Sequence, residues 1–172
     1  MQFVDSREGN IYAVPFASQA VSTAGPVDLV TLKSPSGMRV QLLDITLGQS
    51  SSNPSAIQAL GLMIFTGSSS TASTGATITA QNQRRWSGAP TAGTSCNGLS
   101  TSLLSTASAT LVLADAFEAN SGKWRYRPSE EGGVPIVLNI NQRMNLRLTT
   151  PSLALTMFGS VTIKELGAGL PA

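Results

Sequence analysis

The sequence predicts an all-β protein, an antiparallel sandwich or barrel of about eight to ten short strands. Apolar residues recur at every second position in most segments, and no long stretch repeats at the 3.6-residue period of a helix. Clusters of Gly, Pro, Asn and Ser separate these segments, as is typical of antiparallel β domains. Hydrophobic residues make up 41% of the 172 residues, which is enough for the core of one domain.

Alternating segments in the first half of the chain predict the first strands. Two of them flank the turn at Gly25-Pro26, and a further one follows after residue 59. Because residues at positions i and i+2 of a strand share a face, each segment predicts one face directed at a core. The apolar positions are Val14 and Phe16, then Val27, Leu29 and Val30, and then Leu60, Leu62 and Ile64, with Met63 and Phe65 on the opposite face.

The segment at residues 38–48 changes phase in its middle. One extra residue in a strand reverses the facing of every residue after it, which is what a β-bulge does. The sequence therefore predicts a bulged strand here. Val40 and Leu42 have one parity, and Leu43, Ile45 and Leu47 have the other.

The second half of the chain repeats the alternating pattern up to its last residues. These segments predict the remaining strands of the same antiparallel fold. Their apolar positions are Leu111 and Leu113 before Phe117, then Trp124 and Tyr126, then Ile136, Leu138 and Ile140, then Met144, Leu146 and Leu148, and finally Leu155, Met157, Val161 and Ile163.

Two segments depart from the alternation. Residues 99–113 place Leu103, Leu104 and Ala107 at helical spacing, but their Ser, Thr and β-branched content fits a loop and strand equally well, so both structures stay open. Residues 67–98 begin with GSSSTASTG and predict a long Ser/Gly-rich loop, because such residues gain little from burial.

The chain accordingly divides into three parts. We expect an N-terminal arm at residues 1–10, a single domain at residues 11–167 that includes the long loop, and a C-terminal tail at residues 168–172. The arm contains no apolar run of the kind that a targeting signal needs, and no stretch of the chain approaches the roughly 18 apolar residues of a membrane span. We expect synthesis in a cytoplasm and no membrane partner.

The residues that are absent exclude several kinds of chemistry. Without His there is no Ser–His–Asp triad and no imidazole metal ligand. The lone Cys96 can form neither an internal disulfide nor a cysteine zinc site, and we expect a buried small hydrophobe or a solvated thiol. A net charge of +2, from 11 Lys and Arg against 9 Asp and Glu, is too small for a nucleic-acid footprint. We expect no metal, no cofactor and no nucleic acid.

Carboxylate and serine positions give no catalytic arrangement either. Glu130 and Glu131 are adjacent, so their side chains point apart on an extended chain, and Asp115 and Glu118 sit near a strand end. Ser95 lacks the following glycine of a nucleophile elbow. We therefore expect no enzyme.

Two strings are candidates for protein contacts. Arg84, Arg85 and Trp86 lie within the long loop, either as an exposed tip whose Trp packs on the body or as a contact element, because Arg and Trp are enriched at interface hot spots. Arg125 and Arg127 alternate with two aromatic residues, which predicts an aromatic core face and an arginine face available to the carboxylates of a neighbouring subunit.

Several short strings occur in a characteristic order along most of residues 11–167. The strings are Ala13-Val14-Pro15-Phe16-Ala17, Val27-Asp28-Leu29, Gln49-Ser50-Ser51, the strand from Leu60 to Thr66, Gly122-Lys123-Trp124-Arg125-Tyr126-Arg127-Pro128-Ser129-Glu130 and Ser160-Val161-Thr162-Ile163-Lys164-Glu165-Leu166-Gly167. In this order they resemble a family of small structural proteins encoded near the coat-protein genes of tailed bacteriophages. The W-x-Y-x-P-x-E string and the Glu-Leu-Gly ending are the most specific parts of the resemblance.

The resemblance implies a jelly-roll sandwich that acts as a decoration, or cement, protein on the outside of an icosahedral capsid. Its expected partners are the major capsid protein and further copies of itself, as a dimer or trimer, and its expected location is the capsid exterior of the virion. The family has no catalytic residues to carry over. The chain departs from it at residues 84–86 and 94–110, where the contacts with a particular capsid would differ. A receptor- or glycan-binding jelly-roll module of a head or tail fibre is the alternative.

Overall fold

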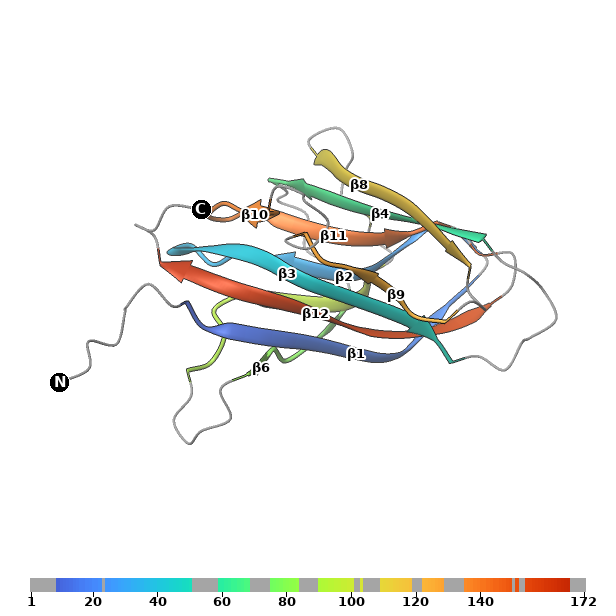
Figure 1. Cartoon of the computed structure of the whole chain (residues 1–172), viewed down its shortest axis with the longest axis horizontal. Helices are drawn as coiled ribbons and strands as arrows, with labels where there is room; N and C mark the ends of the chain where they lie inside the picture. The colour runs from blue at the N-terminus through green and yellow to red at the C-terminus, as the bar shows by residue number, and fades with distance from the viewer. Residues whose placement is uncertain are drawn as a thin grey trace.

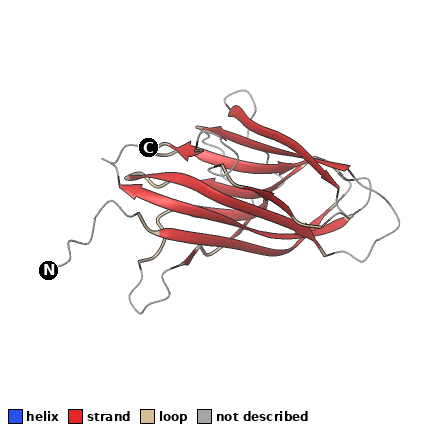
Figure 2. Cartoon of the chain, viewed as in Figure 1, coloured by secondary structure: helices blue, strands red, loops and turns tan. Residues whose placement is uncertain are grey.

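Two antiparallel sheets make up the part of the chain that the structure describes. The structure is a computed structural model, and in its described residues the chain forms twelve strands and no helix (Figure 2). The all-β prediction is confirmed, and the strand count exceeds the expected one because several pairings are only two residues long. The described residues are 9–22, 24–50, 59–68, 75–83, 90–100, 103, 109–118, 122–128, 135–149, 151 and 154–167.

The first sheet, sheet A, has the longest strands of the molecule at its centre. Its strand order is β10-β3-β12-β1-β6, and β9 also pairs with β3. Strands from the two ends of the chain therefore lie side by side, since β12 separates β1 from β3 (Figure 1). The strands are β1 (Ile11–Val21), β3 (Met38–Gln49), β6 (Gln81–Asn82), β9 (Trp124–Tyr126), β10 (Val137–Leu138) and β12 (Leu155–Gly167).

The second sheet, sheet B, has the order β5-β7-β2-β11-β4-β8. Here too a late strand, β11, lies between two early ones, β2 and β4. This nested order agrees with the jelly-roll type, which stays a prediction. The strands are β2 (Val27–Lys33), β4 (Ala59–Gly67), β5 (Ala76–Thr77), β7 (Ser95–Ser100), β8 (Ala109–Glu118) and β11 (Arg143–Leu148).

The hydrophobic core lies between the two sheets and contains the residues that the alternation selects. Burial of these side chains is the main force that holds the sheets together. Val14, Leu62, Ile64, Met144, Leu146, Leu148, Met157, Val161 and Ile163 are fully buried, and Phe16, Leu60 and Leu155 are nearly so.

The predicted bulge in β3 is confirmed. Leu42 pairs with Ile163 and Asp44 pairs with Thr162, so Leu43 has no partner in β12. The extra residue allows both Leu42 and Ile45 to face the core, although their positions differ by an odd number. It also turns Asp44 to the opposite face of sheet A, where the candidate site lies.

The prediction for Ile140 is wrong. Ile136 and Leu138 are buried, but Ile140 is 41% exposed and lies in a turn. The amide of Gln142 donates to the carbonyl oxygen of Asn139 over 3.0 Å, and Asn141 adopts a positive φ of 59°. This tight turn ends the alternation, so the parity of the preceding residues does not carry over to Ile140.

The structure differs from the expected loop at residues 67–98 and, where it describes residues 99–113, agrees with the strand alternative. The predicted loop at residues 67–98 contains β5 and β6, and its last four residues belong to β7. Within residues 99–113, the described ends belong to strands β7 and β8, which contradicts the helical alternative there. β7 pairs with β2, and β8 pairs with β4. These pairings supply the backbone hydrogen bonds that stabilise both segments as strands, and sequence periodicity does not report them.

Of the predicted arm, the structure describes only Gly9 and Asn10. The amide of Glu165 donates to the carbonyl oxygen of Asn10 over 2.9 Å, so the chain joins sheet A already before β1. The rest of the arm and the predicted tail at residues 168–172 lie outside the described residues. No described segment is a helix long and apolar enough to cross a membrane.

Candidate functional site

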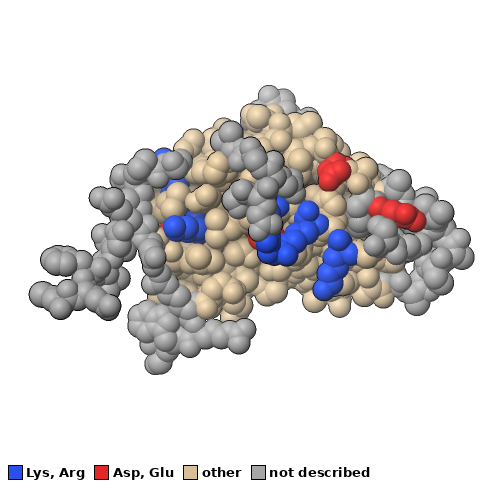
Figure 3. All heavy atoms as spheres, in the orientation of Figure 1, with Lys and Arg blue, Asp and Glu red and all other residues tan. Residues whose placement is uncertain are grey.

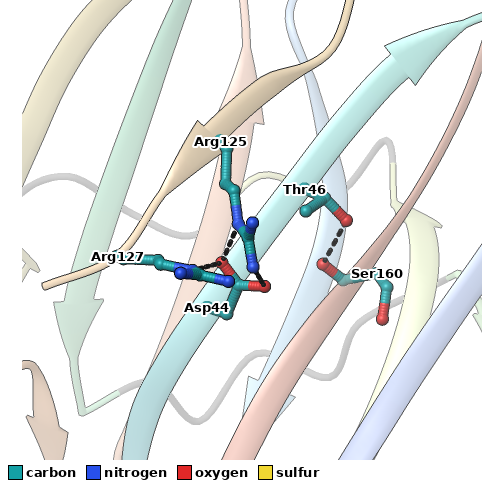
Figure 4. A network of polar contacts seen from close by, with 5 residues as sticks. All are labelled: Asp44, Thr46, Arg125, Arg127 and Ser160. Atoms are coloured by element: carbon teal, nitrogen blue, oxygen red, sulfur yellow. Dashed lines mark hydrogen bonds and ion pairs between the residues drawn. The ribbon is translucent and has the colours of Figure 1, made fainter. Parts of the chain in front are cut away.

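The arginine string lies on β9, beside the bulge of β3. In the pairing of these strands, Arg125 lies opposite Thr46. The guanidinium of Arg125 donates to both carboxylate oxygens of Asp44, over 2.9 and 3.1 Å, and Nε of Arg127 donates to Oδ1 over 3.3 Å (Figure 4). One carboxylate therefore holds two arginines, one of them in the bidentate geometry that arginine favours.

The two aromatic residues of the same string face the other way, as the alternation predicts. The rings of Trp124 and Tyr126 stack with centroids 6.1 Å apart and pack against the core. The indole Nε1 of Trp124 donates to Oδ2 of Asp115 over 2.8 Å. Since Asp115 lies on β8, this bond joins sheet A to the edge strand of sheet B.

The arginine cluster is accessible to solvent. The side chains of Arg125 and Arg127 are 48% and 33% exposed, and that of Asp44 is 22% exposed. We expected the arginine face to be available to the carboxylates of a neighbouring subunit. In the structure, both arginines bind a carboxylate of their own chain. The two arginines thus share the Asp44 carboxylate at a position that solvent can reach.

Around this cluster lies the outer face of sheet A, the face directed away from sheet B. Strand registers align its residues in three rows across β9, β3, β12 and β1, and all of them are partly or largely exposed. Small, hydroxyl and uncharged side chains make up most of it. The rows are Arg125, Thr46, Ser160 and Pro15; then Asp44, Thr162 and Ala13; and then Gln41, Lys164 and Ile11.

The described charges on this face are predominantly positive. Arg125, Arg127 and Lys164 stand against the single carboxylate of Asp44. In Figure 3, Lys and Arg side chains gather in the middle of the view, and the larger Asp and Glu surfaces lie above them and to the upper right. In the described residues, the outer face of sheet A is therefore a hydroxyl-rich surface with a group of arginines near its centre.

The other predicted contact residues fall outside the described part of the chain. Arg84, Arg85 and Trp86 are among the residues whose placement the structure does not describe, as are Glu130 and Glu131. Among the described residues, no group of three His, Cys, Asp or Glu side chains is placed to hold a metal ion.

The Glu-Leu-Gly ending has a structural role that the sequence did not indicate. Glu165 is 4% exposed, and its Oε1 accepts hydrogen bonds from the amide and the hydroxyl of Thr94, over 2.7 and 2.6 Å. Because Thr94 precedes β7 and Glu165 lies on β12, these bonds join the two sheets at one end of the sandwich.

Two core residues adjoin this carboxylate. Burial, together with the nearby Glu165, raises the pKa of the Cys96 thiol to about 12. The same two causes, in the same order, raise the pKa of the Tyr12 hydroxyl above its ordinary value. The interpretation of Cys96 as a buried small hydrophobe is confirmed, since it is 2% exposed and its thiol stays neutral at physiological pH.

A second ionic cluster lies on sheet B, and sequence reasoning missed it. Asp28 is fully buried and accepts hydrogen bonds from Nε of Arg147, over 2.8 Å, and from the side-chain amide of Asn145. The Arg147 guanidinium also lies over the ring of Phe65, 4.9 Å from its centroid. The sequence signal for this cluster is a charged residue between apolar ones in each strand, Asp28 in β2 and Arg147 in β11. Such residues are seldom buried without a partner, so their position predicts an ion pair.

A shallow hollow of about 290 Å³ opens at the end of sheet A near β9. Phe16 and Phe158 contribute aromatic surface to it, and Lys123 contributes the charge. The ring of Phe158 covers Gly48, where an added Cβ would come within 2.7 Å of the ring. The position of the Phe158 ring thus requires a residue without a side chain at position 48.

Comparisons with known proteins leave this geometry as the basis for any functional argument. No protein-family model matches the chain, and no match is found among curated proteins or among solved structures.

Proposed function

We propose that this protein is a structural virion protein without catalytic activity, which binds the outer surface of an icosahedral tailed-phage capsid and stabilises the coat lattice. Its partners in this proposal are the major capsid protein and other copies of itself. The proposal keeps Arg84, Arg85, Trp86, Arg125 and Arg127 as contact residues.

The observation that carries the proposal is the outer face of sheet A. A flat sheet face with many hydroxyls and few charges can form a wide, hydrogen-bonded interface without burying many ions. Arg125 and Arg127 are exposed on this face, where their guanidinium groups can bind carboxylates of an acidic surface on the coat protein. Binding at many symmetry-related positions would multiply a modest affinity for each site.

The strings that resemble the decoration-protein family add support. In the W-x-Y-x-P-x-E string, the two aromatic rings stack beside the core. The two arginines of the same string bind Asp44 on the outer face, so its residues form the contacts on both faces of β9. Glu165 of the closing string joins the two sheets. A rigid body with an open face is what a lattice-binding protein needs.

Charge reversal on the outer face tests the proposal. Purified capsids that lack this protein are mixed with the wild-type chain or with the double variant Arg125→Glu and Lys164→Glu, and binding is measured by co-sedimentation. Repulsion from an acidic surface predicts an affinity loss of at least about tenfold, with a weaker dependence on salt for the remaining binding. Lys33→Glu is the matched control, because Lys33 lies on sheet B. Wild-type affinity of the double variant would refute the assignment of this face.

The alternative, a receptor- or glycan-binding module of a fibre, rests on the hollow beside Phe16 and Phe158. Ligand sites are commonly concave and lined with aromatic side chains plus a few polar groups. A glycan array separates the alternatives, because a lattice protein predicts no specific signal. Binding that is lost in Phe158→Ala and kept in Arg125→Glu would favour the fibre module.

A further inference from the structure

Strand β8 is the outermost described strand of sheet B. β8 pairs with β4 from Ala109 opposite Gly67 to Glu118 opposite Ala59, and no described strand pairs with its other side. Figure 1 shows β8 at the margin of the sandwich. An edge strand offers a row of backbone donors and acceptors to any other extended chain.

The side chains of this strand are unusually apolar for their exposure. Leu111 and Val112 are 49% and 40% exposed, and among the described residues only Ile140 is a comparable exposed large hydrophobe. Val112 occupies a bulge, since Leu113 pairs with Ile64 and Leu111 pairs with Phe65. The bulge leaves two successive apolar side chains in solvent.

Strand β1 of sheet A offers a comparison. Among the described strands, β6 covers its outer side only at Tyr12 and Ala13, and beyond them Pro15 has no amide to donate. Proline and charged residues are usual means of blocking edge pairing. β8 contains no Pro, Lys or Arg, and its bulge places apolar rather than charged side chains in solvent.

We infer that β8 is the contact by which two copies of this chain associate, edge to edge and antiparallel about a two-fold axis near Val112. The charges of the strand favour a second copy in this register. Asp115 and Glu118 are confined to one end, and antiparallel pairing centred on Val112 places Asp115 opposite Ala109 of the second copy. A register centred on Asp115 would instead oppose two carboxylates.

This arrangement accounts for both the backbone edge of β8 and its exposed apolar side chains. The backbone edge gains partners, the exposed Leu111 and Val112 of each copy lose contact with solvent, and the same patch serves both subunits, as a two-fold interface requires. The contact lies on sheet B, so the outer face of sheet A stays open. The inference does not depend on the proposed capsid role, and its test needs only the purified chain.

Sedimentation equilibrium of the full chain gives the test. The wild-type chain is expected to form a dimer of the 17.8 kDa subunit. Val112→Lys places two positive charges at the axis and is expected to raise the dimer dissociation constant at least about tenfold. Ile140→Lys is the matched control, with equal exposure outside β8, and is expected to remain dimeric.

A cysteine at the axis supplies a measurement that needs no disruptive variant. Val112→Cys is expected to form a disulfide between copies under mild oxidation, because residues at a two-fold axis approach their own counterparts. Ala17→Cys on the β1 edge is exposed too and is expected to stay monomeric on a non-reducing gel. The native Cys96 is buried and does not compete. A monomeric wild-type chain, a dimer that persists in Val112→Lys, or a disulfide at Ala17→Cys but not at Val112→Cys would each overturn the inference.

Discussion

In the part of the chain that the structure describes, two carboxylate–arginine clusters lie in opposite environments, one on each sheet. On sheet B, the side chains of Asp28 and Arg147 are 0% and 7% exposed, whereas on sheet A those of Asp44 and Arg125 are 22% and 48% exposed. Both clusters use an arginine Nε bonded to a carboxylate over a nearly equal distance, 2.8 Å in one and 2.9 Å in the other. Geometry alone therefore does not distinguish their roles.

Solvent makes the difference between them. A buried ion is costly to leave without its partner, so the Asp28 cluster fixes the pairing of β2 with β11. An exposed ion pair contributes little to stability, because water and salt screen it and can replace the partner. The Asp44 cluster is therefore free to exchange its internal bonds for those of a binding partner.

The largest effect is expected for Asp28→Ala. The substitution leaves the guanidinium of Arg147 buried without its carboxylate, which lowers the free energy of unfolding by about 3–5 kcal/mol. Urea unfolding followed by circular dichroism measures the loss. The double variant Asp28→Leu and Arg147→Met is expected to recover most of it, because it removes both buried charges. A loss below about 1 kcal/mol in Asp28→Ala would show that the cluster is not structural.

Alkaline pH is expected to destabilise the protein through Cys96. The unfolded thiol loses its proton near pH 9, whereas the buried thiol keeps its proton up to about pH 12. The unfolded state therefore binds fewer protons between these values. The stabilising contribution is complete below pH 9 and decreases by about 1.4 kcal/mol per pH unit up to about 12.

Urea unfolding at a series of pH values above 8 measures this slope. The raised pKa of Tyr12 acts in the same direction at pH values above its ordinary 10. Cys96→Ala is expected to show a shallower decrease than the wild type, whatever its stability at neutral pH. Equal slopes in the two proteins would contradict the assignment to Cys96.

An intermediate effect is expected for Glu165→Ala. The change removes the acceptor from the buried amide of Thr94, which costs about 1–3 kcal/mol of unfolding free energy. Thr94→Val removes only the hydroxyl bond and keeps the amide bond, so its cost is expected to be smaller. If Thr94→Val cost as much as Glu165→Ala, the amide bond would not be the important one.

The smallest effect is expected for Asp44→Ala, the counterpart of the first substitution on the exposed cluster. It is expected to lower the free energy of unfolding by less than about 1 kcal/mol, because its arginines remain solvated. The same urea experiment measures it. A loss as large as that of Asp28→Ala would remove the distinction between the two clusters.

The sequence predicted much of the fold, because alternation reports which face of a strand is buried. It located the bulge in β3 from the phase change around Leu42 and the core faces of β11 and β12. It failed at Ile140, where a turn follows two residues after the strand. Alternation describes local geometry, and a tight turn interrupts it without changing residue type.

The candidate site was less predictable, because its contacts join strands far apart in the chain. Asp44 and Arg125 are 81 positions apart, and Asp28 and Arg147 are 119 apart. Residue spacing predicted that Arg125 and Arg127 share a face. Only the register of β9 on β3 places that face over Asp44, and register depends on the packing of the whole sheet.

The number of copies of this chain in each purified phage particle, relative to the major coat protein, tests the central proposal most directly. A lattice-binding protein predicts a ratio near one or a simple fraction set by the capsid symmetry. The same preparation, dissociated and quantified by mass spectrometry, gives the value. A ratio far below any lattice fraction, as for a fibre module, or absence from the particle would contradict the proposal.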